Sequence, residues 1–445
     1  MLVAHFADTH LGRILYGIRE TEEQIINHFE QAVDQALAEH VDAFIFAGDF
    51  LDERKPPIRV LKKAIEIVEK ITGKGVAVFM VPGEHDRWTR GDDSPQALFR
   101  NAYTPGRNKY FTKRISKNGR EYVFTGLNYI YVRSSDEARQ ALHQQVMEAD
   151  KAAGRYDILI MHQNIENYFP LDKGLSISNI PATPRYVAMG HLHRRILDKR
   201  AVEGKNQVIA YPGSIDVLNV EEAEEARRNG KGFYIVDLTP EEPIVHKINV
   251  ETTPFEYVEA SAKESDWRPK IAEALARLAK QVSQGNKGIL YVKITMSTGE
   301  TVSLERIINL IIEEKKKKLP GSHDLIFHKL ERKLAQETLE KPSGQLQTPR
   351  GELETLADYL TRELGAKPEE ASKLAEHLSS LKEAFRQGDE ESLEQTLEEL
   401  AKAGFWSRIG IPEEYIKLEE AKPPAAGRSE PNARKPSRLT EYFKR

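Results

Sequence analysis

Residues that bind metals or transfer protons recur directly after short apolar runs in the first half of the sequence. The stretch Asp42–Asp52 is the clearest case, because five apolar residues, Ala43 to Ala47, end abruptly at Gly48-Asp49. An apolar run of this length that stops at a glycine is typical of a buried parallel strand. Open α/β sheets bind their ligands at the carboxyl ends of such strands. Asp49 is therefore predicted to lie at a functional sheet edge.

Other acidic and histidine residues follow apolar runs in the same way. The complete set of strand-end residues is Asp8, His10, Asp49, Glu84, His162, His191 and His193. Histidines and carboxylates without a cysteine suit borderline divalent ions such as manganese, iron or zinc. Two cations about 3.5–4 Å apart that share a carboxylate activate water and stabilise in-line phosphoryl displacement. A lone histidine is usually structural, but this repeated pattern indicates a metal site on one edge of the sheet.

Strand-like and helix-like segments alternate through the first 240 residues, which favours a layered α/β domain. Strands are predicted at residues 2–8, 42–49, 76–81, 122–126, 157–161, 186–189, 208–211 and 232–238, and helices at 20–39, 58–71 and 138–152. The polar motifs stop near residue 250. A strand at 288–296, a helix from Leu304 and a strand at 324–328 then predict a small α+β unit.

The composition changes again beyond residue 340. Residues 341–351 have the Pro- and Gly-containing composition of a linker, and residues 352–410 contain three short amphipathic helices. Residues 352–403 carry 14 acidic and 6 basic side chains, a net charge of −8, so they are not a DNA-binding segment. A protein-binding element is the natural interpretation, with a helical cap on the chain's own body as the alternative. The basic residues 421–445 are predicted to be disordered.

Bulk composition limits the function classes. A chain of 445 residues is too long for one ordinary domain. The net charge of −4 gives no global nucleic-acid signature, so any DNA-binding surface must be local. The sequence has no cysteine, which excludes disulfides and thiolate metal sites. The opening apolar stretch is too short for a signal peptide and no window approaches the length of a membrane span, so we expect a cytoplasmic, nucleoid-associated protein without membrane contact.

The motifs together resemble those of the calcineurin-like metallophosphoesterases. They are Asp8-x-His10, Gly48-Asp49-x-x-Asp52, Gly83-x-His85-Asp86, His162 and Gly190-His191-x-His193. Within that superfamily, the segments FADTHLG, GDFLDERKPP, MGHLHRR and YPGSID are similar to the Mre-eleven/SbcD nucleases of double-strand break repair, with an archaeal length and tail.

This resemblance implies a four-layer metallophosphoesterase β-sandwich flanked by helices over residues 1–245. It also implies a small α+β capping and DNA-recognition domain over residues 250–335. A C-terminal helical segment over residues 352–410 completes the expected architecture.

The same resemblance implies two Mn²⁺ per subunit, which other divalent ions can replace. The residues matched to one metal are Asp8, His10, Asp49 and His193, and those matched to the other are Asp49, Glu84, His162 and His191. His85 is expected to protonate or stabilise the leaving oxygen, and Asp86 to orient or charge His85.

Two positions depart from the family pattern, which has Asn in place of Glu84 and commonly His in place of Asp52. The extra charge of Glu84 should tighten metal binding, weaken the ions as Lewis acids and repel an incoming phosphate. Arg87 and Arg90 are expected to offset part of that charge.

Local basic and aromatic residues predict where DNA binds. Arg13, Tyr16, Arg87 and Arg90 lie in segments that can contact DNA phosphates, with an ordinary solvated surface as the alternative. The resemblance implies that the chain binds double- and single-stranded DNA ends and forms a homodimer through amino-terminal helices. It further implies that residues 352–410 bind a Rad-fifty-like coiled-coil ATPase, which gives a heterotetramer.

The last residues carry a separate signal. Leu439, Tyr442 and Phe443 have the i, i+3, i+4 spacing of a short helical anchor. They resemble the sliding-clamp-binding peptide of replication and repair proteins, although Pro436 stands where that peptide usually has Gln. A packed or disordered tail end is the alternative.

We therefore predict a manganese-dependent DNA exonuclease and endonuclease, a phosphodiester hydrolase that works with an ATPase partner. One alternative is a non-catalytic DNA-end-binding scaffold of the same complex, because of Glu84. Another is a calcineurin-like phosphodiesterase for cyclic nucleotides or small phosphate esters, although such substrates need neither the second domain nor the helical segment.

Overall fold

The computed structural model describes eight segments and a few single residues of the chain. The segments are residues 1–87, 93–131, 136–170, 172–282, 287–296, 302–319, 326–334 and 367–387, and the single residues are Leu353, Leu356, Ala357, Leu360, Thr361, Thr396 and Leu400. The chain divides into two compact units, Met1–Glu337 and Thr338–Arg445. The second unit contains α8 (Pro368–Gln387).

The first unit contains a six-stranded sheet with the order β12-β11-β1-β2-β3-β4. Its strands are β1 (Leu2–Phe6), β2 (Ala43–Ala47), β3 (Ala77–Val81), β4 (Ala102–Tyr103), β11 (Gly232–Asp237) and β12 (Ile244–Asn249). Strands β1 to β4 run parallel, and β11 and β12 extend the sheet in antiparallel fashion. A 3₁₀ turn, Pro95–Leu98, precedes β4.

A second six-stranded sheet has the order β5-β6-β7-β8-β10-β9. Its strands are β5 (Tyr110–Lys117), β6 (Arg120–Leu127), β7 (Ile158–His162), β8 (Tyr186–Gly190), β9 (Ile196–Val202) and β10 (Lys205–Tyr211). The four central strands are parallel, and β5 and β9 pair with them antiparallel at the two edges. The 3₁₀ turn Ile177–Asn179 lies between β7 and β8.

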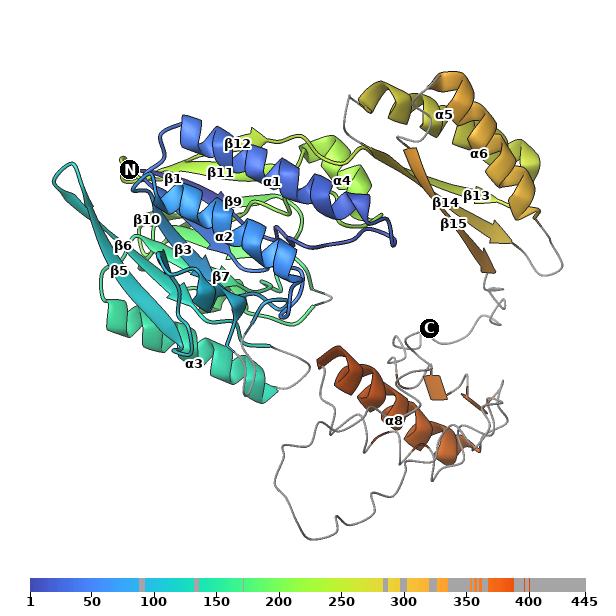
Figure 1. The fold of residues 1–445 in the computed structure, drawn as a ribbon. Coiled ribbons are helices and arrows are strands. Elements are labelled where there is room, and N and C mark those ends of the chain that lie inside the picture. Colours follow the sequence, from blue (N-terminus) through green and yellow to red (C-terminus); the bar gives the residue numbers. More distant parts are fainter. Residues whose placement is uncertain are drawn as a thin grey trace, which may run out of the picture. The chain divides into compact units, whose positions relative to one another are not determined.

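The two sheets pack face to face and helices cover their outer faces. Along β2, Ile45 packs into the core between the sheets, and its neighbours Phe44 and Phe46 pack under α1 (Glu20–Ala38) and α2 (Ile58–Thr72). Successive side chains of a strand point to opposite faces, so a strand buried on both faces is apolar throughout. On the other side, α3 (Asp136–Ala153) packs against the second sheet. Figure 1 shows these layers, which confirm the predicted four-layer β-sandwich flanked by helices.

A third, three-stranded sheet follows. Its parallel strands are β13 (Phe255–Ser261), β14 (Gly288–Met296) and β15 (Ile326–Leu334). Parallel neighbours require crossover connections, which here contain α5 (Glu264–Gln281) and α6 (Leu304–Lys318). Both helices bury their apolar stripes on the sheet in one cluster centred on Trp267, Ile271 and Leu290.

Short polar contacts join this third sheet and its helices to the sandwich. The side-chain amide of Gln24 on α1 donates to Thr253 Oγ1 and to the Lys287 carbonyl, both at 2.9 Å. Nearby, α4 (Glu222–Asn229) lies between β10 and β11 in the sequence. No helix within the described residues is both long and apolar enough to cross a membrane.

His5 on β1 is fully buried between the two sheets. Its Nδ1 lies 2.8 Å from the Tyr186 hydroxyl. Burial lowers the pKa of His5 from 6.5 to about 3. Between these values the unfolded chain binds a proton that the folded chain does not, so stability decreases as the pH falls through 6.5.

Replacing His5 by Gln tests this linkage, because Gln can still accept a hydrogen bond from Tyr186 but does not titrate. Between pH 6.5 and pH 5, the His5 contribution to the unfolding free energy of the wild-type chain should fall by about 2 kcal/mol. The pH dependence of His5→Gln should be smaller by that amount. Urea unfolding in the presence of a chelator measures both. Parallel pH profiles of the two chains would contradict the buried, neutral imidazole.

Candidate metal centre

The residues predicted to bind metal lie at the carboxyl ends of strands in both sheets of the sandwich. The first sheet contributes Asp8, His10, Asp49 and Glu84, and the second contributes His162, His191 and His193. The sequence pattern predicts a single sheet edge for these residues, whereas the structure divides them between two sheets. Contacts join the two edges, since the backbone N–H of His191 donates to Asp8 Oδ1 at 2.9 Å. The two sheet edges therefore form one polar centre.

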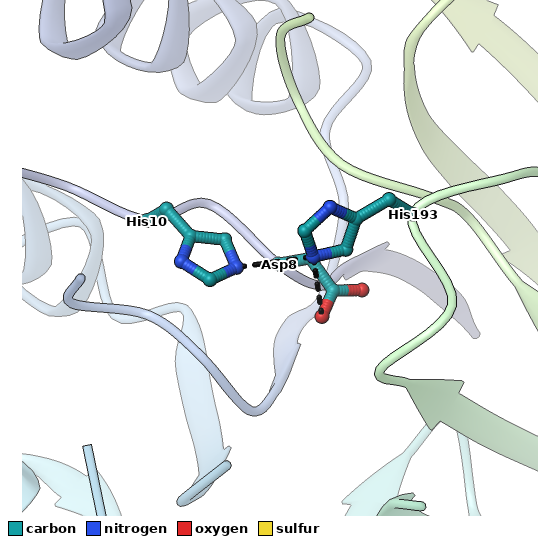
Figure 2. A group of neighbouring side chains, drawn as sticks. All are labelled: Asp8, His10 and His193. Carbon is teal, nitrogen blue, oxygen red and sulfur yellow. Dashed lines mark hydrogen bonds and ion pairs between the residues drawn. The ribbon is translucent and has the colours of Figure 1, made fainter. Parts of the chain in front are cut away.

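Most of the predicted ligand atoms lie close together. Three groups have ligand atoms within 4.8 Å of one another: Asp8, His10 and His193; Asp8, Asp49 and His162; and His10, Asp52 and His85. Figure 2 shows the first group, with the two imidazole rings directed toward one another beside the Asp8 carboxylate. Asp49 Oδ2 links the groups, since it lies 3.6 Å from His10 Nε2 and 3.3 Å from His162 Nε2. Within the described residues, Glu84 and His191 belong to none of these groups.

The backbone at this centre adopts a conformation that side-chain-bearing residues rarely take. Asp8, His10, Asp49 and His191 have positive φ angles of 51°, 44°, 46° and 99°. Each such residue costs about 1–2 kcal/mol relative to an ordinary conformation. Backbone hydrogen bonds from Asp8 N to Gly48 O and from His10 N to Asp49 O hold the first two loops together. Strain of this kind concentrates at functional sites.

Three imidazoles of the centre use Nδ1 for a hydrogen bond and direct Nε2 toward other residues of the centre. Nδ1 of His10 donates to Asp52 Oδ1 at 3.0 Å, that of His193 to Glu222 Oε1 at 2.8 Å, and that of His162 to the Ala47 carbonyl at 2.9 Å. A hydrogen on Nδ1 leaves a lone pair on Nε2 of the neutral ring. An acceptor on the outer nitrogen is how metal-binding histidines are oriented.

The free nitrogens point at other lone pairs. His10 Nε2 lies 3.1 Å from His193 Nε2, and the buried His162 Nε2 has no hydrogen-bond partner. Lone pairs that face one another repel unless a positive charge lies among them. This donor set of imidazole nitrogens and carboxylate oxygens fits a divalent cation.

The pKa values of the buried His162 and Asp49 also indicate that this centre favours positive charge. Burial alone would lower the pKa of His162, but the carboxylates of Asp49 and Asp8 outweigh it and raise the value to about 10. Burial would likewise raise the pKa of Asp49, yet His162 and His10 hold it well below its usual range. The centre therefore attracts a cation strongly.

His85 and Asp86 lie beside this centre but do different things. Nδ1 of the half-buried His85 donates to the Asp52 carbonyl at 2.9 Å, and its ring centre lies 4.8 Å from that of His10. The buried Asp86 carboxylate accepts hydrogen bonds from the backbone of Gly83, Phe50 and Leu51. We expected Asp86 to orient His85, but the hydrogen bonds described for the two side chains go to other residues. Asp86 instead holds the loops after β2 and β3 against each other.

Two acidic residues at the centre were not singled out from the sequence. Glu222 accepts a hydrogen bond from His193. Burial would raise the pKa of the Glu222 carboxyl, but His193 and Lys231 outweigh burial and lower this pKa to about 2. Asp172 Oδ2 lies 2.6 Å from His191 Nε2. Neither residue directly follows a strand, since Asp172 lies between β7 and β8 and Glu222 is the first residue of α4, so the strand-end pattern does not identify them.

The residues predicted to bind DNA are placed as follows. Arg13 is 40% exposed at its side chain and contacts Asp52 Oδ1 at 3.4 Å. Tyr16 packs edge-on against Tyr291 of β14. Arg87 lies over the rings of Tyr129 and Tyr131, at 5.9 and 4.9 Å. The predicted residues outside the described part of the chain are Arg90, Leu439, Tyr442 and Phe443.

Comparison with known proteins gives the same assignment as the motifs. The model of the calcineurin-like phosphoesterase family matches residues 1–195. The protein named "DNA double-strand break repair protein Mre11" from Methanococcus maripaludis is 28% identical over 302 residues, which cover 66% of this chain and 78% of the relative. The protein of the same name from Saccharolobus solfataricus is 25% identical over 377 residues, covering 81% and 90%. The one from Aeropyrum pernix is 30% identical over 260 residues, covering 57% and 61%.

Gly48 leaves the space that the His162 ring occupies. Its φ is +86°, and a Cβ atom there would lie 2.2 Å from His162 Nδ1. Gly48→Ala should displace the ring and weaken Mn²⁺ binding by about tenfold or more. Gly75→Ala is the matched control, because Gly75 has a φ of +76° and open space around its Cβ position. Calorimetric titration of Mn²⁺ into both variants measures the difference, and equal affinities would show that His162 is not a ligand.

Proposed function

We propose that this chain is a metal-dependent DNA nuclease of double-strand break repair, because its residues 1–195 match the model of the calcineurin-like phosphoesterase family and the chain is similar to the archaeal Mre11 proteins. In this proposal it hydrolyses phosphodiesters at DNA ends as an exonuclease and endonuclease. The observation that carries the proposal is the pair of histidine and carboxylate groups that meet at Asp8.

We propose two Mn²⁺ per subunit as the working cofactor. Asp8, His10, Asp49 and His193 would hold one ion, and Asp49, Glu84, His162 and His191 the other. The unpartnered Nε2 of His162 and the position of Asp49 between His10 and His162 support this division. Such ions supply a water of lowered pKa and neutralise charge on the phosphoryl group.

The chain's own residues then complete the reaction. Nδ1 of His85 donates to the Asp52 carbonyl, so the proton that the imidazolium gives to the leaving oxygen comes from Nε2. The ring becomes the neutral tautomer with its hydrogen on Nδ1, which the same carbonyl stabilises. Asp86 keeps the loops carrying His85 and Asp49 in register through its three backbone hydrogen bonds.

DNA ends, double- or single-stranded, are the proposed substrate. Arg13 and Arg87 lie near the centre and can contact phosphates. The proposed partners are a second copy of the chain and a Rad-fifty-like ATPase bound by residues 352–410, which gives a cytoplasmic, nucleoid-associated heterotetramer. Clamp binding by Leu439, Tyr442 and Phe443 also stays a proposal, which loss of clamp affinity after deletion of residues 437–445 would test.

A non-catalytic DNA-end scaffold is the second candidate, because of Glu84. This residue is half-buried, and its charge adds to burial in raising the pKa of Tyr129. A full negative charge there, where the family has a neutral amide, opposes an incoming phosphate.

Removal of the proposed acid tests the nuclease directly. The wild-type chain should degrade end-labelled duplex DNA with Mn²⁺, and His85→Ala should lower the rate by a factor of about 10²–10⁴. His143→Ala is the control, because His143 is an exposed histidine on α3. Absence of cleavage by a wild-type chain that still binds Mn²⁺ and DNA would favour the scaffold.

Glu84→Asn separates the two candidates further. Loss of one negative charge should weaken Mn²⁺ affinity and raise the turnover number, since the ions become stronger Lewis acids and the phosphate is repelled less. Glu66→Asn on the exposed face of α2 removes an equal charge away from the centre. Calorimetry and single-turnover cleavage measure the two quantities. If neither changed, the argument from the charge of Glu84 would be wrong.

A further inference from the structure

We propose that Glu222 is a positioning residue for His193, held in place by its buried ion pair with Lys231. The inference rests on the proposed metal centre, because its consequence is the orientation of one of the metal ligands. Nothing in the motif pattern assigns a role to either residue.

The ion pair holds His193 at two points. Glu222 Oε1 accepts from Nδ1 of the imidazole at 2.8 Å, and Lys231 Nζ donates to the backbone carbonyl of the same histidine at 2.6 Å. The two charged groups contact each other at 2.6 Å. Ring and backbone of His193 are therefore fixed relative to one pair of charges.

The hydrogen-bonding capacity of both charged groups is fully used. The three ammonium hydrogens of Lys231, which is 1% exposed, point to His193 O, Ser214 Oγ and Glu222 Oε2. The carboxylate of Glu222 accepts in addition from Asn219 Nδ2 at 2.9 Å and from Ser214 Oγ at 2.8 Å. A carboxylate with donors on both oxygens has little freedom to rotate.

The His193 side chain is less enclosed by the protein than those of His10 and His162, so its orientation depends more on hydrogen bonds. It lies in the loop between β8 and β9, and its side chain is 27% exposed. With its Nδ1 hydrogen given to Glu222, the ring presents the Nε2 lone pair to His10 at 3.1 Å and to Asp8 at 3.9 Å. The alternative tautomer would place a hydrogen on Nε2 and could not bind a cation there.

The helix that carries Glu222 is anchored from its other end. Arg227 of α4 contacts the buried carboxylate of Glu256 on β13 at 3.2 Å, and Arg277 of α5 contacts the same carboxylate at 2.9 Å. The position of Glu222 is thus fixed by the sandwich through Lys231 and by the third sheet through Arg227.

Glu222→Gln is the sharpest test, because it keeps the shape of the side chain. The ammonium of Lys231 can only donate, so the amide oxygen must face Lys231 and the amide NH₂ must face His193 Nδ1. This reverses the hydrogen bond and selects the tautomer with a hydrogen on Nε2. Mn²⁺ affinity of the full chain, measured from the EPR signal of free Mn²⁺, should fall about tenfold or more. Glu224→Gln, an exposed position on the same helix, should leave the affinity unchanged.

The double variant Glu222→Leu/Lys231→Met distinguishes positioning from stability. It removes both charged groups together, so no buried ammonium is left without its counter-charge and the melting temperature should rise above that of Glu222→Gln. The Mn²⁺ affinity should stay low, because a leucine cannot accept the Nδ1 hydrogen of His193. The proposal is overturned if Glu222→Gln binds Mn²⁺ like the wild-type chain, or if the affinity recovers together with the melting temperature. A wild-type chain that binds Mn²⁺ without cleaving DNA would instead defeat the proposed function and leave this comparison intact.

Discussion

The centre of this protein depends on unshared electron pairs that the fold forces together. His10 Nε2 and His193 Nε2 lie 3.1 Å apart, and each ring donates a hydrogen bond from Nδ1 to an acidic residue. Asp49 Oδ2 lies 3.3 Å from the unpartnered Nε2 of His162. Each of these contacts is unfavourable without a positive charge among the donors. The two sheets hold these side chains close together and prevent them from moving apart, so the centre favours the binding of cations.

The sandwich can maintain this arrangement because its stabilising buried core and its strained backbone lie in different places. The core between the sheets is mostly apolar, with stacked rings such as Phe79 and Phe124 at 4.1 Å, and it includes the buried pair of His5 and Tyr186. The unusual φ angles occur just beyond the strands, at Asp8, His10, Asp49 and His191. A few kcal/mol of local strain is acceptable where burial of large side chains contributes about 1.5–3 kcal/mol for each. Strain at the sheet edge places the side chains where an ordinary turn would not.

The sequence predicted the strands that are buried on both faces, because an apolar run that ends in Gly-Asp has few other interpretations. It missed β5, β9 and β12, whose exposed and charged residues at the sheet edges hide the strand pattern. It also missed the short β4, β13 and the helices α4 and α5. It could not show that the ligands come from two sheets, because residues that follow β1 and residues that follow β8 look alike in the sequence. Glu222 and Asp172 were missed for a related reason. Their roles arise from contacts with His193 and His191, 29 and 19 residues away, and no local pattern marks them.

The location of bound metal is the most direct test of whether the side chains at the two sheet edges bind cations. Crystals of the full chain soaked in Mn²⁺ would be measured at the manganese absorption edge. The account predicts anomalous difference peaks at the carboxyl edges of the two sheets, one beside Asp8, His10 and His193 and one beside Asp49 and His162. Fully soaked crystals with no peak at this edge, or with manganese bound elsewhere only, would contradict it.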